Sequence, residues 1–205
     1  MKEAMMQDYK KSFQENGYVL VKNFITKDVA KYLYEYLMFS THAHILAGNK
    51  NSISGDSQVP GSFTRGHGDL ALDSLMKMMK PKMEEVTGLE LYPTYTYSRI
   101  YKQGNYLAHH TDRPSCEVSI TMRLSANDNS YNWPIWMKDT EYSLDDGDGV
   151  VYRGCDLDHW RETCDAPPHW RMGQVFMHYV DKNGPHSEYK YDQRNAKAKL
   201  FESTI

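Results

Sequence analysis

The N-terminal part of the chain alternates apolar and polar side chains at helical spacing. The pattern predicts a helix over 3–16, a short strand over 18–21 and a second helix that begins at Thr26. A third helical pattern covers 69–87, and we expect Pro81 to interrupt it. Three amphipathic helices therefore precede the rest of the chain.

After about residue 90 the pattern changes to short runs rich in β-branched and aromatic residues, separated by turn signals. The runs predict strands over 91–101, 117–124, 132–138, 149–152 and 174–180. Several short strands that follow two or three helices favour an α+β fold, with a β-sandwich or barrel backed by the N-terminal helices.

The segment 43–68 fits neither pattern, because Gly, Ser, Asn and Gln dominate it. A long polar segment inside a compact domain is more often functional than idle. We therefore expect a flexible loop here that acts as a lid.

Composition narrows the function classes. The 205 residues fit a single domain over 1–205, and the formal net charge of −3 argues against a general nucleic-acid binder. No apolar stretch approaches the ~20 residues that span a bilayer. The three cysteines form no Cys-x-x-Cys pair, which favours free thiols in a reducing, cytoplasmic compartment.

One short motif offers metal ligands. His110-Thr111-Asp112 places a histidine and a carboxylate two residues apart, so in an extended chain both side chains lie on one face. A second His-x-Asp step, His67-Gly68-Asp69, has another explanation, because Asp69 is well placed to cap the helix that follows. A further histidine would complete a set of two histidines and one carboxylate, which suits ferrous iron with open positions. The residues alone leave three candidates for it: His159, His169 and His178.

Longer stretches carry a family resemblance. QENGYVLVKNFITKDVAKYL, RIYKQGNYLAHHTDRPSCEVSITMRLS and GDGVVYRGCDLDHWRE occur in this order and cover most of the chain. Together they resemble the Fe(II)/2-oxoglutarate-dependent dioxygenases, particularly the prolyl-hydroxylase-like branch. The resemblance implies a double-stranded β-helix (jelly-roll) core and an enzyme that uses Fe(II), 2-oxoglutarate and O₂. Such an enzyme hydroxylates a C–H bond of a prolyl peptide, free amino acid or other small substrate, and releases succinate and CO₂. It implies neither a nucleic-acid nor a membrane partner.

The resemblance also assigns roles to residues. It implies that His110, Asp112 and His159 hold the metal, since it puts the distal histidine just after the GDGVVYRG stretch. A basic side chain is expected to hold the far carboxylate of 2-oxoglutarate, because a guanidinium can meet a carboxylate with two parallel hydrogen bonds. Arg171 is the first candidate for this role, with Arg123 and Arg161 as rivals.

Aromatic residues complete the expected site. Tyr101 matches the family tyrosine that donates its hydroxyl toward 2-oxoglutarate, and Tyr106 matches a second tyrosine nearer the metal. The tryptophans Trp133, Trp136 and Trp160 could wall the pocket or pack in the sheet. Two competing classes remain: a non-catalytic metal-binding jelly-roll protein, and a zinc hydrolase built on the same ligands.

Overall fold

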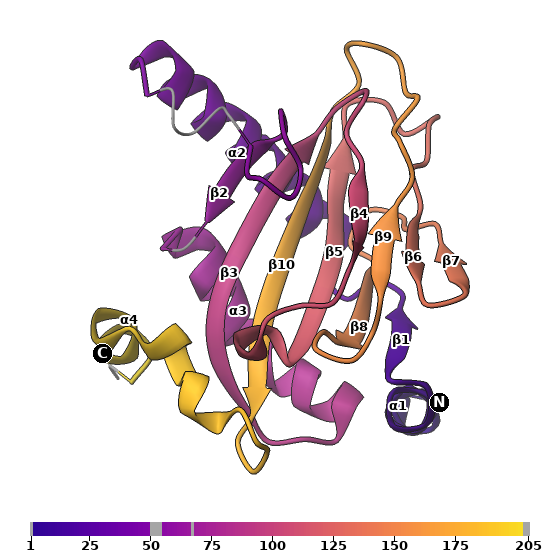
Figure 1. The fold of residues 1–205 in the computed structure, drawn as a ribbon, viewed down its shortest axis with the longest axis vertical. Coiled ribbons are helices and arrows are strands. Elements are labelled where there is room, and N and C mark those ends of the chain that lie inside the picture. The colour runs from indigo at the N-terminus through magenta and orange to yellow at the C-terminus, as the bar shows by residue number, and fades with distance from the viewer. Residues whose placement is uncertain (1, 50–54, 67, 203–205) are drawn as a thin grey trace.

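Two antiparallel β-sheets face one another in the computed structural model, which describes residues 2–49, 55–66 and 68–202 (Figure 1). The larger sheet has the order β1 (Tyr18–Val21), β8 (Gly149–Arg153), β5 (Val118–Ala126), β10 (Met172–Asp181), β3 (Leu91–Tyr101) and β2 (Phe63–Gly66). The smaller sheet has the order β4 (Leu107–His110), β9 (His159–Arg161), β6 (Ile135–Met137) and β7 (Thr140–Tyr142). From β3 to β6 each successive strand lies in the opposite sheet, which is the winding of a jelly roll and confirms the expected fold class.

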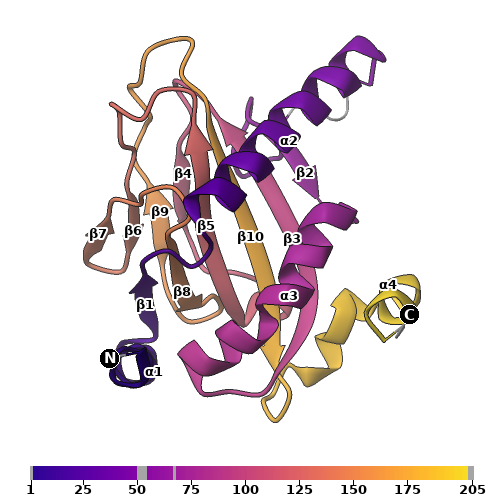
Figure 2. The same ribbon diagram turned by 180° about the vertical axis from the view of Figure 1, so that it is seen from behind.

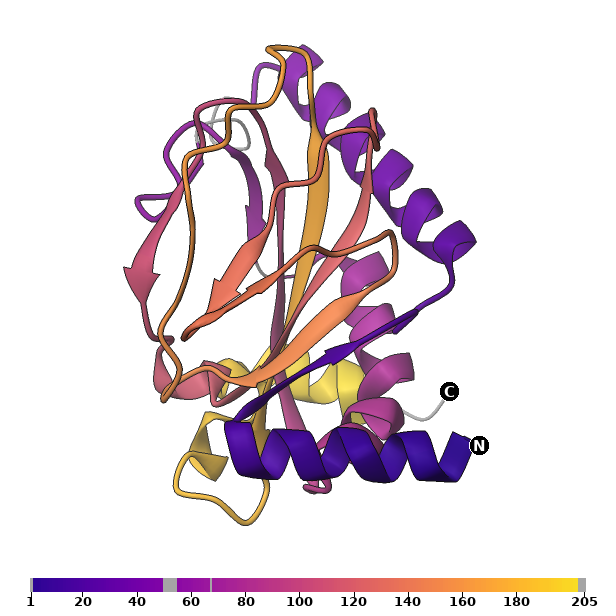
Figure 3. The same cartoon turned by 90° about the vertical axis from the view of Figure 1, so that its right-hand side faces the viewer.

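Helices cover the outer face of the larger sheet. Seen from behind, α2 (Lys27–Leu46) and α3 (Leu70–Thr87) lie across this face, while α1 (Lys2–Asn16) lies at its lower end (Figure 2, Figure 3). The main core lies between these helices and the sheet, and it includes Ile120 and Met122 of β5 and Val175 and Met177 of β10. Two side chains cap the helices as expected: the Thr26 hydroxyl accepts from the N–H of Val29, and Asp69 accepts from those of Ala71 and Leu72.

The third helix differs from its prediction. Pro81 does not interrupt α3, which runs continuously from Leu70 to Thr87 and ends at Gly88 in the left-handed conformation with φ 73°. Packing of Leu72, Met76 and Met83 against the sheet stabilises the helix on both sides of the proline.

Several strands escaped the sequence pattern. β2, β4, β7 and β9 contain only three or four residues each, which is too short for an alternation to be recognised. The expected loop over 43–68 is correspondingly shorter, because α2 continues to Leu46 and β2 pairs with β3; residues 50–54 and His67 lie outside the described residues. A short 3-10 helix, η2 (Pro114–Cys116), connects β4 to β5. After β10 the chain ends with η3 (Ser187–Gln193) and α4 (Asn195–Glu202).

The two faces of the larger sheet have different chemistry. Gln174 of β10 pairs with Arg99 of β3, and Phe176 pairs with Tyr97, so these four side chains share the face that looks toward the smaller sheet. This inner face is rich in polar groups, whereas the outer face is apolar. Among the described helices, none is both long and apolar enough to cross a membrane.

Candidate metal centre

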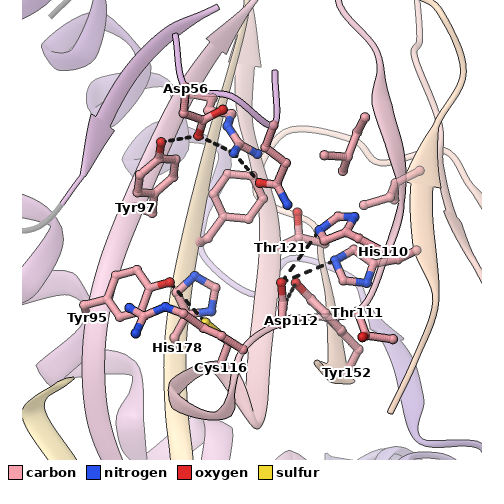
Figure 4. A pocket seen from close by; sticks show the side chains of 17 residues that line it. Asp56, Tyr95, Tyr97, His110, Thr111, Asp112, Cys116, Thr121, Tyr152 and His178 are labelled. Carbon is pink, nitrogen blue, oxygen red and sulfur yellow. Dashed lines mark hydrogen bonds and ion pairs between the residues drawn. The ribbon is translucent and has the colours of Figure 1, made fainter. Parts of the chain in front are cut away.

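Three side chains converge where β4 ends and β9 begins. His110 ends β4, Asp112 follows two residues later, and His159 begins β9, where it pairs with His110 across the two strands. The Asp112 Oδ1 atom lies 3.7 Å from Nε2 of His110 and 3.8 Å from Nε2 of His159 (Figure 4). The structure therefore brings together the three residues that the resemblance implied as ligands.

Backbone carbonyls orient both imidazoles. Nδ1 of His110 lies 2.9 Å from the carbonyl oxygen of Ala108, and Nδ1 of His159 lies 2.9 Å from that of Leu157. A carbonyl can only accept, so each Nδ1 carries the proton and each Nε2 presents its lone pair to the centre.

Asp112 is positioned by its neighbours. Its backbone N–H donates to the carbonyl of Gly154, and its Oδ2 atom accepts from the Tyr152 hydroxyl at 3.2 Å. A Cβ at position 154 would lie 2.2 Å from the carbonyl oxygen of Cys116 and 2.7 Å from Oδ2 of Asp112. Only glycine lets this turn approach the carboxylate so closely.

Burial shifts the pKa values of the three side chains. It lowers the pKa of His110 and of His159, so both rings are neutral at physiological pH, and it raises the pKa of Asp112 to about 6. A bound cation would favour the ionised carboxylate that burial disfavours. Two neutral imidazoles and one carboxylate on a single face form a donor set that fits Fe(II) and leaves coordination positions free.

A cavity of about 320 Å³ opens beside these ligands. Its walls are aromatic and polar (Figure 4), and they include Tyr95, Tyr97, Arg99, Thr121, Phe176 and His178. Asp56 and Gln58, from the segment expected to be a lid, lie at its edge. Asp56 accepts a hydrogen bond from Tyr97 and one of 2.6 Å from Arg99.

The arginines expected to hold a carboxylate lie elsewhere. Arg171 donates to the carbonyls of Pro168 and Trp170 and does not line the cavity. Arg123 is buried, but its charge is paired with Asp146 at 3.1 Å. The structure therefore brings neither Arg171 nor Arg123 to the cavity, because Arg171 stays on the loop before β10, and Asp146, Asn129 and the carbonyl of Leu144 hold the Arg123 guanidinium.

Arg161 has different surroundings. It is 3% exposed, and its guanidinium donates to the carbonyl of Trp133 and, at 3.3 Å, to the side chain of Gln174. Gln174 in turn donates to the hydroxyl of Thr121, which lines the cavity. Among the described residues no carboxylate forms an ion pair with Arg161, and burial lowers its pKa to about 10. In the part of the chain that the structure describes, this buried guanidinium has no anionic partner, and it does not itself line the cavity.

Tyr101 lies in the same deep region. It is fully buried, its ring lies 5.7 Å from the Arg161 guanidinium, and its hydroxyl makes no close hydrogen bond among the described residues, although it lies near enough to Arg99 to help raise the pKa of that guanidinium against the effect of burial. The Nε atom of Arg99, on the same strand, is likewise buried without a partner. Orphaned donors beside an unpaired guanidinium are what a site for a carboxylate requires.

Other candidates lie away from the centre. Tyr106 is 49% exposed and does not line the cavity. Trp136 and Trp160 stack on each other, with Trp160 also stacked on His109, and neither they nor Trp133 line the cavity. His169 is exposed, whereas His178 lines the cavity beside Cys116 and bonds to Ser119 at 2.8 Å. The tryptophans thus belong to the sheet packing.

Sequence reasoning missed Asp56, Gln58, Tyr152 and Gly154. The alternation of side chains along β8 could have indicated that Tyr152 faces the inside of the fold. The contact between Asp56 and Arg99 joins residues 43 positions apart, so no local sequence pattern indicates it.

Comparisons with known proteins bear on the fold. No family model matches the chain, and no curated protein matches its sequence. Solved structures do match: a prolyl-4-hydroxylase from Pseudomonas putida has a TM-score of 0.59 at 13% identity, over 85% of this chain and 98% of that one. The non-heme α-ketoglutarate-dependent epimerase SnoN of nogalamycin biosynthesis has a TM-score of 0.64 at 15% identity, over 87% of this chain and 83% of that one. EctD from S. alaskensis, solved with 2-oxoglutarate and 5-hydroxyectoine, has a TM-score of 0.63 at 13% identity, over 91% and 83%.

These likenesses define the class of fold. The chain has the jelly-roll fold of the Fe(II)/2-oxoglutarate oxygenases, in agreement with the resemblance found in its sequence.

Proposed function

We propose that the protein is an Fe(II)- and 2-oxoglutarate-dependent oxygenase that hydroxylates a C–H bond. The observation that carries the proposal is the convergence of His110, Asp112 and His159 beside a cavity, with both Nε2 atoms facing the same carboxylate oxygen. A structural zinc site closes its coordination with four protein ligands, whereas this set leaves room for co-substrate and oxygen.

The co-substrate site follows from the buried charges. Arg161 stands two residues after His159 on β9, so both side chains lie on the inner face, about 7 Å apart along the strand. The far carboxylate of 2-oxoglutarate would neutralise Arg161 and accept from the Tyr101 hydroxyl. Arg99 lines the cavity, which Arg161 does not, but Asp56 already pairs with Arg99, whereas Arg161 connects to the cavity wall through Gln174 and Thr121 and has no acidic partner among the described residues.

The chain's own groups have separable tasks. When bound, iron and 2-oxoglutarate supply the chemistry that activates O₂ for hydroxylation, with release of succinate and CO₂. His110, Asp112 and His159 would hold the metal, and Tyr152 donates to Oδ2 of Asp112, which leaves Oδ1 facing both imidazoles. Arg161 and Tyr101 orient the co-substrate. Leu107 and Phe176 line the cavity and belong to the same apolar cluster as Tyr101, which does not line it.

The cavity limits the substrate. Its volume of about 320 Å³ and its wall of Tyr95, Tyr97 and Phe176 suit a small molecule or one side chain of a peptide, such as a prolyl residue or a free amino acid. Structures of this fold include a prolyl hydroxylase from Trichoplax adhaerens in complex with a peptide fragment as well as EctD, so both substrate sizes occur in the fold. The proposed catalytic unit is one domain over 1–205, and free thiols at Cys116, Cys155 and Cys164 favour a cytoplasmic location.

The test is an anaerobic titration of the metal-free protein with Fe(II) and 2-oxoglutarate, followed by the weak visible charge-transfer band of the chelate. We expect the band in the wild-type protein and in His178→Ala, and its loss in His110→Ala and His159→Ala. His178→Ala is the matched control, because His178 lines the same cavity outside the proposed ligand set.

A folded wild-type protein that binds Fe(II) but gives no band would overturn the oxygenase and favour a non-catalytic metal-binding jelly roll. A band that requires His178 instead of His159 would keep the class but reassign the third ligand.

A further inference from the structure

The outer face of the smaller sheet carries a row of aromatic rings behind the metal centre. His109 of β4, Trp160 of β9 and Trp136 of β6 come from three strands that lie side by side (Figure 1). Ring centroids are 3.8 Å apart for His109 and Trp160 and 5.6 Å apart for Trp160 and Trp136, with nearly parallel planes in both pairs. Two of these rings belong to chain neighbours of the ligands His110 and His159. Because neighbouring side chains of a strand point to opposite faces, the row backs the ligands.

The pairing of β4 with β9 contains a bulge. The register shifts by one residue between Leu107 and His110, so two residues of β4, Ala108 and His109, stand opposite Trp160 of β9. In a regular strand, residues three apart point to opposite faces, yet Leu107 and His110 both line the cavity. The bulge is therefore what turns His110 inward.

The bulge also orients the ring of His110. The carbonyl of Ala108, one of the two bulged residues, accepts from Nδ1 of His110 at 2.9 Å. That bond leaves Nε2 of the ring 3.7 Å from Oδ1 of Asp112. A change in the backbone at 108–109 would therefore turn the ligand's ring as well as displace it.

Side chains join the two strands at the bulge, where the backbone ladder is short. β4 contains four residues and β9 three, and their register consists of two residue pairs. The ring of His109 stacks on Trp160, and its Nδ1 lies 2.7 Å from Oδ2 of Asp158. A carboxylate accepts, so the ring nitrogen donates this hydrogen bond. His109 thus contacts both residues that flank the ligand His159.

We propose that His109 is a positioning residue of the metal centre, whose contacts with Trp160 and Asp158 hold the bulge that turns His110 toward the cation. This role rests on the proposed metal centre and adds no ligand to it. His109 does not line the cavity, and 60% of its side chain is exposed, so it acts through the backbone of β4. Bulges beside active sites commonly direct a side chain in this way.

The test compares the Mn(II) affinity of His109 variants, measured by calorimetry. We expect His109→Ala to lower the affinity by about tenfold, as for other groups that orient a ligand from behind. His109→Phe keeps a ring that can stack on Trp160, so it should retain most of the affinity. His169→Ala is the matched control, because it makes the same substitution at an exposed histidine that does not line the cavity. It should leave the affinity unchanged.

Two further readouts distinguish positioning from a general effect on stability. The visible absorption spectrum of the Co(II)-loaded protein reports coordination geometry, so it should change in His109→Ala and return toward the wild-type spectrum in His109→Phe. In a double-mutant cycle, His109→Ala and Trp160→Leu should lower the Mn(II) affinity non-additively, because both remove the same stack. Lower stability in urea alone would move neither readout.

The outcomes separate this role from the proposed function. Wild-type Mn(II) affinity and an unchanged Co(II) spectrum in His109→Ala would overturn the positioning role. Equal weakening by His109→Phe and His109→Ala would also overturn it, because loss of the nitrogen would then suffice, as expected for a ligand of the cation. A wild-type protein without Mn(II) affinity would overturn the metal centre and this role together. Absence of 2-oxoglutarate binding in a protein that binds Mn(II) would overturn the oxygenase alone.

Discussion

At the scale of single residues, the ion-pair partners of four arginines indicate which of them could bind an anionic ligand better than their positions in the sequence do. Arg171 is half-buried and bonds to backbone carbonyls, Arg123 is paired with Asp146 and Arg99 with Asp56, so within the described residues Arg161 is left as a buried guanidinium without an acid. A buried charge is tolerated when a partner arrives to neutralise it. This reasoning favours Arg161 as the residue that recognises an anionic ligand.

Replacing Arg161 should therefore affect the co-substrate and not the metal. We expect Arg161→Gln to weaken 2-oxoglutarate binding by about 10- to 100-fold, the loss expected for charge-assisted hydrogen bonds. The measurement is the 2-oxoglutarate dependence of the charge-transfer band at saturating Fe(II). Arg171→Gln serves as the control, and unchanged 2-oxoglutarate affinity in Arg161→Gln would refute the assignment.

Tyr152 holds the carboxylate of the metal site. Tyr152→Phe removes the hydroxyl that donates to Asp112 Oδ2 but keeps the ring in its buried place. We expect Mn(II) affinity, measured by calorimetry, to fall about tenfold, as for other groups that orient a ligand from behind. Tyr18→Phe, which removes a hydroxyl bonded to Thr140, should leave the affinity unchanged. Equal affinities in both variants would contradict this role for Tyr152.

At the scale of elements, α3 shows packing prevailing over local preference. Pro81 cannot donate to the carbonyl one turn earlier, yet the helix continues because its apolar face is buried along its whole length. Pro81→Ala restores the missing N–H, so we expect the free energy of unfolding in urea to rise by about 1–3 kcal/mol. Met78→Ala, at an exposed position of α3, should change it by less than about 0.5 kcal/mol. A decrease for Pro81→Ala would show that the proline shapes the helix to fit the sheet.

The longer elements follow from their sequences, while the shortest ones do not. The period and the capping residues predict α1, β3 and the starts of α2 and α3 to within a residue or two, whereas α2 continues to Leu46, past the expected start of the loop. β4 and β9 are too short to show a period, yet they carry His110 and His159. Here the His-x-Asp spacing and the family resemblance indicated the ligands before any strand was recognisable.

At the scale of the whole molecule, the metal site links stability to pH. Burial raises the pKa of Asp112 to about 6, so the folded, metal-free protein holds this proton more tightly than the unfolded chain does. Its contribution to stability is therefore lost as pH rises from about 4 to above 6. A cation at the site compensates the ionised carboxylate.

We accordingly expect the rise in melting temperature caused by saturating Mn(II) to grow with pH over this window. Asp112→Asn should show a smaller rise with a weaker pH dependence, because only His110 and His159 then exchange protons for the cation. Scanning calorimetry at several pH values measures both. An equal Mn(II) effect at low and high pH in the wild-type protein would contradict the linkage.

The sequence by itself determined the helices, the long strands and the His-x-Asp step, because these depend on periodicities and spacings between neighbours in the chain. It also carried the order of motifs that resembles the oxygenases. The tertiary structure alone decided which arginine is buried without a counter-charge, since that depends on residues far apart in sequence, such as Asp146 for Arg123 and Asp56 for Arg99. It likewise decided that Tyr32, Phe39 and Leu46 of α2 are exposed within the described structure, because burial is a property of the packed molecule and not of the helix pattern.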